Sequence, residues 1–388
     1  MSNRRSRSRR REKIFGINND VFYAVLIFAI LIIVVSLVII ISLDLYEKKK
    51  VSEEKERINS EVENIFEDTN KSLESLNDYK TSSLIRFSAV GDILCGNNLK
   101  KYTKDYNYIF EDVKGCMKDA DFVLGTYETT STDKNFIQSI KNAGINMVSL
   151  AHNHALDDGI EGLNNTKSIL ENEKIQPIGI SSDKVEERVK IVEKKNVKIA
   201  VLGYTYDNKK QGVNIFSKDL AKADLDYAKQ NANVIIVLMH WGNLNTNTVS
   251  KEQESQADFL IKNGANVIIG AHPSAVQKME IKKNDEGKDC FVAYSLGDFT
   301  SDFESENANL ELILNFQIYM DKDKNVSIYK VDYTPVYMTD LGVKNENRYK
   351  ILDMKNEIAN YDTENSKIDK RTYDKLVRGL DKLKNIIK

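Results

Sequence analysis

The feature that most constrains this chain is an uncharged apolar run near its N-terminus, Val21–Leu43, with the sequence VFYAVLIFAILIIVVSLVIIISL. At about 1.5 Å of rise per residue, a helix over this run would be about 34 Å long. The hydrocarbon core of a bilayer is about 30 Å thick, so the run is long enough to cross it. Because no small-residue cleavage site follows at Ser42–Tyr46, we expect an uncleaved anchor rather than a signal peptide.

Charge is distributed unevenly along the 388 residues, which carry 56 basic and 58 acidic side chains. The first 13 residues are strongly basic, whereas the part from Asp44 onward is acidic on balance. The positive-inside rule therefore predicts a cytoplasmic tail over 1–20, a single membrane span over 21–43, and a body outside the membrane. An acidic body also argues against nucleic acid as a partner.

Residues 44–83 are rich in charge and contain neither Pro nor Gly, which favours a helical stalk. Val51, Ile58 and Ile65 recur at a spacing of seven, the period of a coiled coil. Two interpretations fit this pattern. The stalk could pair two chains as a parallel homodimer, or it could be a solvated spacer helix.

From residue 84 onward, short apolar runs alternate with amphipathic segments, which predicts an α/β fold with buried strands. A hydrophobic content of 41% excludes a disordered chain, and three cysteines are too few for a disulfide scaffold. The predicted strands are Ile85–Gly91, Phe122–Gly125, Ile145–Ala151, Val197–Tyr204, Val234–His240, Val267–Gly270 and Cys290–Leu296. The predicted helices are Glu161–Glu173, Leu220–Asn231 and Lys251–Asn263.

The alternation of short apolar runs with amphipathic segments ends after Leu296. Leu310–Met320 and Val326–Met338 are long and rich in β-forming residues, which predicts a hairpin. Lys367–Lys388 has the pattern of a basic amphipathic helix that packs on the body. We therefore expect one domain over 84–340 and a helical extension over 341–388.

Histidine is the most informative residue type. The chain has only four, namely His152, His154, His240 and His272, and all of them come just after predicted strands. Ligands of open α/β sheets gather at the carboxyl ends of the strands. The sequence therefore predicts that these imidazoles meet at one edge of the fold. A helix-capping His beside an exposed one, and a His240 that is merely buried in the core, are the alternatives.

Carboxylate and amide groups follow other predicted strands. Together with two of the histidines they form a mixed oxygen and nitrogen set that suits Mn, Fe, Zn or Mg. Glu128 is placed to bridge two ions. The candidate ligands are Asp92, Glu128, Asn153, His240 and His272.

The loop after the third predicted strand also carries groups for proton transfer. His154 lies one residue beyond Asn153 and could act as a general acid toward a leaving group. Asp157 follows in the same loop and completes the candidate catalytic pair. Asp298 is either a carboxylate that orients a histidine ligand or an ordinary turn residue.

Several motifs in this order resemble those of the CapA-type poly-gamma-glutamate capsule biosynthesis proteins. The resemblance covers roughly Ile85 to Asp340, and an anchor before this domain is usual in that family. It implies a calcineurin-like metallophosphoesterase fold, in which two packed sheets are flanked by helices. It also implies a role in making, exporting or anchoring an anionic gamma-linked glutamate polymer. The motifs are Gly91-Asp92-Ile93-Leu94, Glu128, Asn153-His154-Ala155-Leu156-Asp157, His240-Trp241-Gly242, Gly270-Ala271-His272-Pro273 and Tyr294-Ser295-Leu296-Gly297.

The chain also departs from the pattern implied by that resemblance. Leu94 replaces the His of the Asp-x-His motif in related phosphoesterases, as is usual in CapA-like proteins. Ser274 replaces the second His of a His-Pro-His motif, and His152 replaces the first Asn of an Asn-Asn-His motif. We therefore expect one divalent ion and leave a second open, with His152, Ser274 and Asp298 as supporting residues around the ligands.

Two functions follow from these observations. The first is a surface-anchored, metal-dependent hydrolase that acts on a phosphoester or a related bond. The second is a non-catalytic binding or scaffold subunit of a surface-polymer export complex. In both cases the expected partners are the membrane, subunits for polymer synthesis or export, and an anionic polymer or phosphoester.

Overall fold

The computed structural model describes residues 13–14, 17–64, 84–129, 133–206, 212–301, 308–342, 346–361, 363, 366 and 368–387. The chain divides into two compact units, Met1–Glu61 and Val62–Lys388. Each unit is described by itself.

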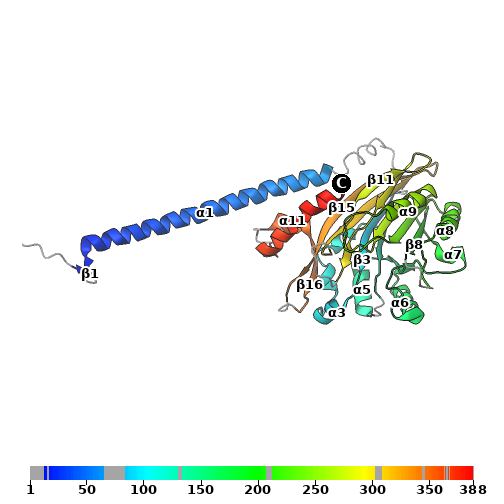
Figure 1. Cartoon of the computed structure of the whole chain (residues 1–388), viewed down its shortest axis with the longest axis horizontal. Helices are drawn as coiled ribbons and strands as arrows, with labels where there is room; N and C mark the ends of the chain where they lie inside the picture. The colour runs from blue at the N-terminus through cyan, green and yellow to red at the C-terminus, as the bar shows by residue number, and fades with distance from the viewer. Residues whose placement is uncertain are drawn as a thin grey trace, which may run out of the picture. The chain divides into compact units, whose positions relative to one another are not determined.

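A single long helix dominates the N-terminal unit. Helix α1 (Asn19–Asn64) is drawn as one uninterrupted blue ribbon in Figure 1. It includes the apolar run Val21–Leu43, which has a mean hydropathy of 3.6 and no buried residue. Two short strands, β1 (Lys13–Ile14) and β2 (Ile17–Asn18), pair antiparallel before it. The helix is thus long and apolar enough to cross a membrane. It continues through the first half of the predicted stalk, and residues 65–83 lie outside the described residues.

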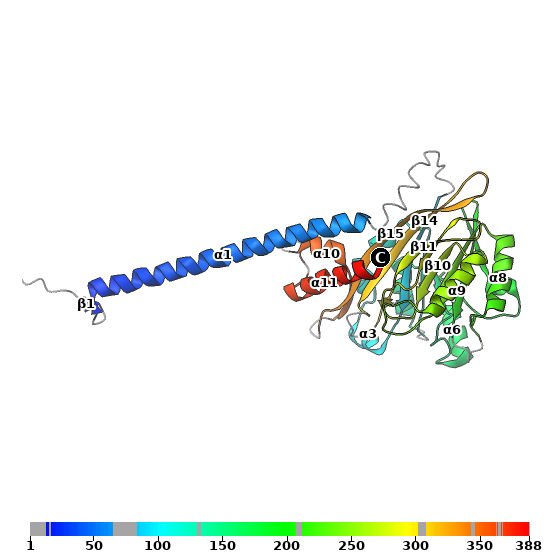
Figure 2. The ribbon, with the colours of Figure 1, turned by 45° about the horizontal axis from the view of Figure 1, so that its top comes forward.

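The larger unit contains two sheets. The six-stranded sheet has the order β11-β12-β10-β9-β8-β7, and β8, β9, β10 and β12 run parallel. Its strands β10 and β11 are labelled in Figure 2. Its edge strands β7 and β11 pair antiparallel. The strands are β7 (Lys190–Lys194), β8 (Val197–Thr205), β9 (Val234–His240), β10 (Val267–Ala271), β11 (Met279–Lys283) and β12 (Asp289–Ala293).

The eight-stranded sheet has the order β16-β15-β14-β3-β4-β5-β6, and β13 pairs with the end of β3. Strands β3 to β6 are parallel, whereas β14, β15 and β16 are antiparallel. The strands are β3 (Leu84–Ile93), β4 (Phe122–Thr126), β5 (Met147–Ser149), β6 (Gln176–Ile178), β13 (Asp298–Thr300), β14 (Leu310–Met320), β15 (Val326–Asp340) and β16 (Tyr349–Asp353).

The two sheets pack against each other, and helices cover their outer faces. Contacts join β3 to β10 and β4 to β9. On β9 the side chains of Ile235, Val237 and Met239 pack in one core cluster with residues of α8 and α9. Because both faces of β9 are buried, its sequence is one continuous apolar run. The predicted α/β architecture of two packed sheets flanked by helices is confirmed.

Ten helical segments lie between or after these strands within the described residues, and most are short. Their bounds are α3 (Asn97–Tyr102), α4 (Asn107–Phe110), η2 (Lys114–Met117), α5 (Lys134–Asn142), α6 (Gly159–Asn172), α7 (Val185–Arg188), α8 (Lys218–Asn231), α9 (Lys251–Lys262), α10 (Met354–Asn360) and α11 (Lys370–Ile387).

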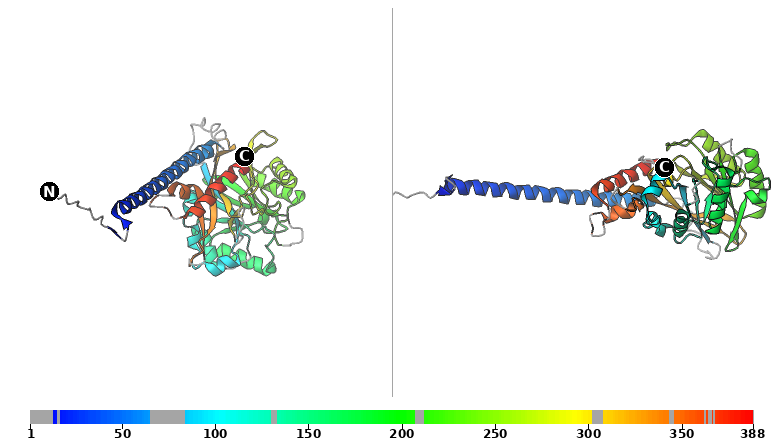
Figure 3. Two further views of the ribbon diagram at one scale, coloured as in Figure 1. Left: turned by 60° about the vertical axis from the view of Figure 1, so that its left-hand side comes forward. Right: turned by 90° about the horizontal axis from the view of Figure 1, so that it is seen from below.

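The C-terminal segment differs from the helical extension that the sequence suggests. Residues 349–353 form β16, which pairs with β15 and belongs to the large sheet. Helix α11 then lies beside α10 and buries one face, as expected (Figure 3). At Gly379 of α11 an added Cβ would lie 2.5 Å from the side chain of Leu310, so the helix packs closely on β14. The segment 341–388 is therefore part of the body rather than an appendage.

Candidate metal centre

Parallel strands of both sheets end at one place and deliver the predicted ligands there. Asp92 is the second-last residue of β3, and Glu128 follows β4 by two residues. His240 is the last residue of β9, and His272 comes directly after β10. The rings of His240 and His272 have centroids 4.7 Å apart. Glu128, His240 and His272 each offer one ligand atom, and these atoms lie within 4.8 Å of one another.

Asp92 adjoins this group. It is fully buried, and its Oδ2 accepts a hydrogen bond of 2.6 Å from the backbone N–H of His272. Its Oδ1 lies 3.4 Å from Nε2 of His240, and Oε1 of Glu128 lies 3.5 Å from the same nitrogen. One imidazole nitrogen thus stands between two buried carboxylates. The structure brings together four of the five predicted ligands.

The centre contains buried polar atoms that have no hydrogen-bond partner. Such atoms are rare in folded proteins, because burying them unpaired costs free energy. The fifth predicted ligand, Asn153, lies between His152 and His154, and its Oδ1 is likewise buried without a partner. Carboxylate, amide and imidazole atoms are also the ligands that divalent ions prefer, so the residues fit a cation. The unpaired atoms are Oδ1 of Asp92, Oδ1 of Asn153, both ring nitrogens of His240 and Nδ1 of His272.

The electrostatics of the centre also favour positive charge. Burial lowers the pKa of His240, but the Asp92 and Glu128 carboxylates outweigh this effect and raise it to about 9. Burial and the Asp92 charge raise the pKa of Glu128, although His240 opposes the shift. Burial and the nearby His240 and His154 lower the pKa of His272 to about 3. His272 is therefore neutral at physiological pH, the form in which an imidazole binds a metal.

The backbone and one tyrosine fix the orientation of His272. Its φ of +98° lies in a region that non-glycine residues rarely adopt, and such strain concentrates at functional sites. The hydroxyl of Tyr206 lies 3.0 Å from Nε2 of His272, whereas Nδ1 is buried without a partner. Sequence reasoning missed Tyr206. It directly follows β8 and so shares the strand-end position of the predicted ligands.

The predicted catalytic pair lies beside this group and is open to solvent. Nδ1 of His154 is 2.7 Å from Oδ2 of Asp157, and both side chains are 52% exposed. The backbone N–H of His154 donates to Nδ1 of His152 at 3.2 Å. His152 itself is buried, with its ring centroid 6.0 Å from that of His240. A histidine held by a carboxylate at the edge of a buried centre has the arrangement of a general acid or base.

Asp298 is not the ordinary turn residue that the sequence offers as one of its two roles. It lies in β13 rather than in a turn, it is fully buried, and it stands in register with Asp92. Burial and the charges of Asp92 and Glu128 raise the pKa of Asp298 well above its ordinary value, although hydrogen bonds from the Ser274 and Ser301 side chains oppose the shift. Ser274 is buried nearby, with a φ of +50°.

Comparison with known proteins identifies the family. The model of the family "Bacterial capsule synthesis protein PGA_cap" matches residues 86–303, which is more than half of the chain. The chain belongs to the PGA_cap family. This assignment confirms the resemblance to capsule biosynthesis proteins that the sequence motifs suggest.

Two curated relatives share this PGA_cap region. The chain is 26% identical over 258 residues to capsule biosynthesis protein CapA of Bacillus anthracis, covering 58% of this chain and 61% of that protein. It is 25% identical over 250 residues to PGA biosynthesis protein CapA of Bacillus subtilis (strain 168), covering 57% of this chain and 64% of that protein. The matched region thus spans less than two thirds of either relative.

Solved structures show weaker likeness to this PGA_cap protein. A hypothetical protein from Thermus thermophilus has a TM-score of 0.46 at 12% identity, covering 65% of this chain and 98% of that one. Purple acid phosphatase PPD1 from yellow lupin seeds has a TM-score of 0.31 at 9% identity, covering 65% of this chain and 54% of that one. Both scores lie below 0.5, so the family assignment rests on the sequence match.

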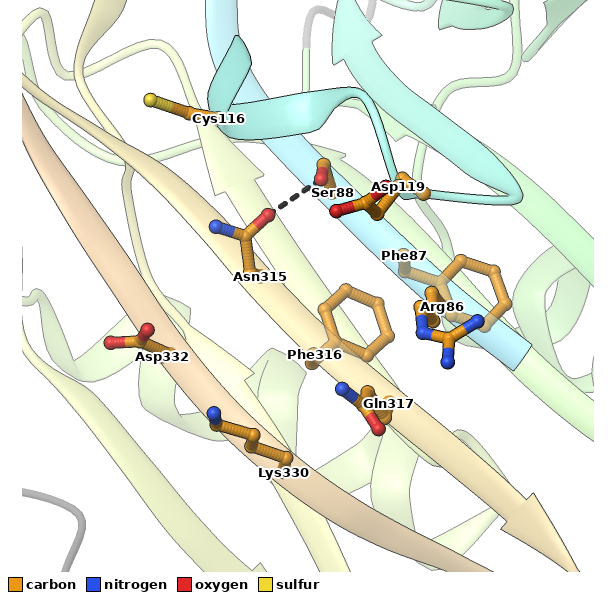
Figure 4. A pocket seen from close by; sticks show the side chains of 11 residues that line it. Arg86, Phe87, Ser88, Cys116, Asp119, Asn315, Phe316, Gln317, Lys330 and Asp332 are labelled. Atoms are coloured by element: carbon orange, nitrogen blue, oxygen red, sulfur yellow. Dashed lines mark hydrogen bonds between the residues drawn. The ribbon is translucent and has the colours of Figure 1, made fainter. Parts of the chain in front are cut away.

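The larger unit also has a polar cavity at the start of β3, away from the histidines. Its volume is about 240 Å³, and its floor consists of two rows of residues in register across β3, β14 and β15 (Figure 4). One row is Ser88, Asn315 and Asp332, and the Ser88 hydroxyl donates to Asn315 at 2.6 Å. The cavity contains charges of both signs but no histidine. It therefore lacks the ligand set of the metal centre.

The Tyr206 contact gives a first prediction. Replacing Tyr206 by Phe removes the hydroxyl that orients His272, and groups of this kind typically change metal affinity 10- to 100-fold. We expect Mn²⁺ to bind about tenfold more weakly, as measured by calorimetric titration. The matched control is Tyr106→Phe, which removes a buried hydroxyl bonded to Asp133 rather than to one of these ligands. Equal affinities in the Tyr206 variant and the wild type would contradict the assigned role.

Proposed function

We propose that this protein is a membrane-anchored member of the PGA_cap family that acts in the synthesis, export or anchoring of a surface polymer, poly-gamma-glutamate. We further propose that its metal centre performs hydrolase-type chemistry on a phosphoester or a related bond. The observation that carries the proposal is the group of Glu128, His240 and His272, with ligand atoms within 4.8 Å of one another. The His154–Asp157 pair beside it supplies a group for proton transfer.

The residues of the centre divide into two roles. Glu128, His240 and His272 would hold one divalent ion, with Asp92 and Asn153 as further ligands. When bound, such an ion acts as a Lewis acid on a phosphoryl or carbonyl oxygen of the substrate. Burial of Asp92, Glu128 and His240 keeps water away from the ligand atoms.

His154 would perform the proton transfer. Its Nδ1 is held by Asp157 at 2.7 Å, which leaves Nε2 to donate a proton to a leaving group. The exposure of this pair lets a bulky substrate reach it. Asp157 would thus fix the ring orientation and stabilise the protonated ring.

We propose a single-pass topology for the anchor. Val21–Leu43 would span the membrane, the basic tail over 1–20 would lie in the cytoplasm, and the domain would lie outside the membrane. This location suits contact with polymer synthesis or export subunits at the cell surface. Pairing of two chains through 44–83 remains a prediction.

A second candidate function is a non-catalytic subunit that uses the same centre to bind the polymer. Leu94 and Ser274 stand where related phosphoesterases carry histidines, which favours this alternative. In that case the ion would hold carboxylates of an anionic polymer without breaking a bond.

An assay of aryl phosphate hydrolysis by the full-length protein in detergent distinguishes the hydrolase from the non-catalytic binding subunit. With Mn²⁺ bound, we expect turnover of an aryl phosphate, and we expect His154→Ala to lower the rate by about 10²- to 10⁴-fold at unchanged metal content. Asp157→Asn should also slow the reaction, whereas the neighbouring control Asp158→Asn should not. Bound metal without turnover in the wild type would overturn the enzyme proposal in favour of the binding subunit. Absence of bound metal would overturn both forms of the metal proposal.

A further inference from the structure

The polar cavity at the start of β3 separates positive from negative charge. Its floor has two rows of side chains in register across β3, β14 and β15 (Figure 4). The first row carries two cations and no acid, and its members are Arg86, Gln317 and Lys330. The second row carries an acid and no cation, and its members are Ser88, Asn315 and Asp332. On a solvated sheet, by contrast, opposite charges that face each other across strands are the stabilising arrangement.

A second acid stands on the wall of the cavity. Asp119 belongs to the turn after η2 and lines the cavity, and Figure 4 draws its carboxylate beside Ser88. The second row thus has an acid at each end, Asp119 at one and Asp332 at the other. The cavity contains two positive and two negative groups, and the two signs occupy opposite sides of it.

These four charged side chains form no ion pair with one another or with any other residue in the described part of the chain. Oδ1 of Asp332 accepts the backbone N–H of Tyr333 at 2.8 Å. A neighbouring acid outside the cavity does pair, because Oδ2 of Asp121 lies 3.1 Å from Nζ of Lys195. The charges of the cavity are therefore available to a ligand.

The amide groups in the middle of the two rows are available as well. Oδ1 of Asn315 accepts the hydroxyl of the buried Ser88 at 2.6 Å, which leaves the NH₂ of Asn315 free to donate. The side-chain amide of Gln317 has no partner among the residues that the structure describes. Each amide can donate to or accept from a ligand that lies across the floor.

Strand geometry sets the length of a ligand that joins the two rows. Along each strand the rows are two residues apart, which is about 7 Å. A bridging ligand must therefore carry its positive and negative groups about 7 Å apart. Two extended residues of a peptide span about 7 Å at most, so a dipeptide fits. The volume of about 240 Å³ also restricts the ligand to this size, because it equals about eight water molecules at about 30 Å³ each.

Other classes of ligand fit these charges less well. Asp119 and Asp332 would repel a polyanion, and Arg86 and Lys330 would repel a metal ion or a polyamine. A zwitterion satisfies both sides of the cavity at once. A zwitterion with a peptide group in its middle also offers partners to the two amides of the floor.

We propose that this cavity binds a short zwitterionic peptide of about two residues. The peptide carboxylate lies on the side of Arg86 and Lys330, and the peptide ammonium lies on the side of Asp119 and Asp332. The site goes beyond the proposed function and needs no metal ion.

Calorimetric titration of the full-length protein in detergent with glycylglycine tests this site. The protein is first stripped of metal with a chelator, because a dipeptide can also ligate a metal ion. We expect saturable binding that is at least about tenfold tighter than the binding of either capped peptide. The capped peptides are acetyl-glycylglycine, which lacks the ammonium, and glycylglycinamide, which lacks the carboxylate.

Two variants assign the ends of the peptide. Lys330→Gln should weaken the binding of glycylglycine about tenfold but leave that of glycylglycinamide unchanged, because the amide has no carboxylate to lose a partner. Asp332→Asn should weaken glycylglycine to a similar extent but leave the acetylated peptide unchanged. The matched control is Lys322→Gln, which alters an exposed lysine outside the cavity and should bind glycylglycine as the wild type does.

The opposite results would overturn the proposal. The cavity would not be a zwitterion site if the wild type gave no saturable heat at millimolar glycylglycine, or if all three peptides bound equally. Loss of glycylglycine binding in His240→Ala would place the peptide at the metal centre instead. If Lys330→Gln does not fold, as judged by its melting transition, Arg86→Gln tests the same end of the peptide.

Discussion

Replacing His240 by Ala is expected to abolish ion binding at the Glu128–His240–His272 group. This ring lies between Asp92 and Glu128 and contacts the ring of His272, so its removal takes away the central nitrogen ligand. Changes to residues that merely support a ligand already cost up to about 100-fold in metal affinity. We therefore expect Mn²⁺ affinity at this site to fall by more than about 100-fold in a calorimetric titration.

The neighbouring residue on β9 provides a matched control for His240→Ala. Met239 points to the opposite face of the strand and packs in the core cluster that includes α8 and α9. Met239→Ala should lower the free energy of unfolding by about 2–5 kcal/mol, as large core truncations do, yet preserve Mn²⁺ binding. If His240→Ala bound Mn²⁺ as tightly as the wild type, His240 would not be a ligand.

Replacing Gly91 by Ala is expected to destabilise the larger unit severely. The added Cβ would lie 1.8 Å from the carbonyl oxygen of Gly297 and 2.8 Å from its carbonyl carbon. These are backbone atoms, and they are held in place because Asp92 N–H donates to the same oxygen at 3.1 Å. Relief of the clash must separate β3 from β13. We expect a loss of about 3 kcal/mol or more in the free energy of unfolding, measured by denaturant titration.

The control for Gly91→Ala is Gly115→Ala. A Cβ at Gly115 would meet no heavy atom within 4 Å, so this variant should change the free energy of unfolding by less than about 0.5 kcal/mol. Because Asp92 directly follows Gly91, the Gly91 variant should also bind Mn²⁺ more weakly. A Gly91→Ala protein as stable as the control would mean that the contact of β3 with β13 is looser than described.

Local pattern in the sequence determined the elements that lie in the core. Strand β9 (Val234–His240) has the predicted bounds, because a strand buried on both faces appears as an unbroken apolar run. Strand β14 (Leu310–Met320) also has the predicted bounds, because it is long and rich in β-forming residues despite its three polar positions. The same pattern located the ends of the strands, and hence the histidines that the structure brings together there. The apolar run Val21–Leu43 determined a long helix because its 23 residues are apolar and long enough to cross a membrane.

Tertiary structure alone decided which side chains meet. Glu311 lies in the segment Leu310-Glu311-Leu312, where an acid between apolar residues resembles an outward-facing strand position. Only the packing of β13 against β14 buries it beside Asp298. Tyr206 and β16 escaped prediction for a related reason: periodicity shows which face of an element is apolar, but not which distant element covers it. The sequence by itself thus determined the strands and their polar ends, and the pairing of strands far apart along the chain decided which of those ends face one another.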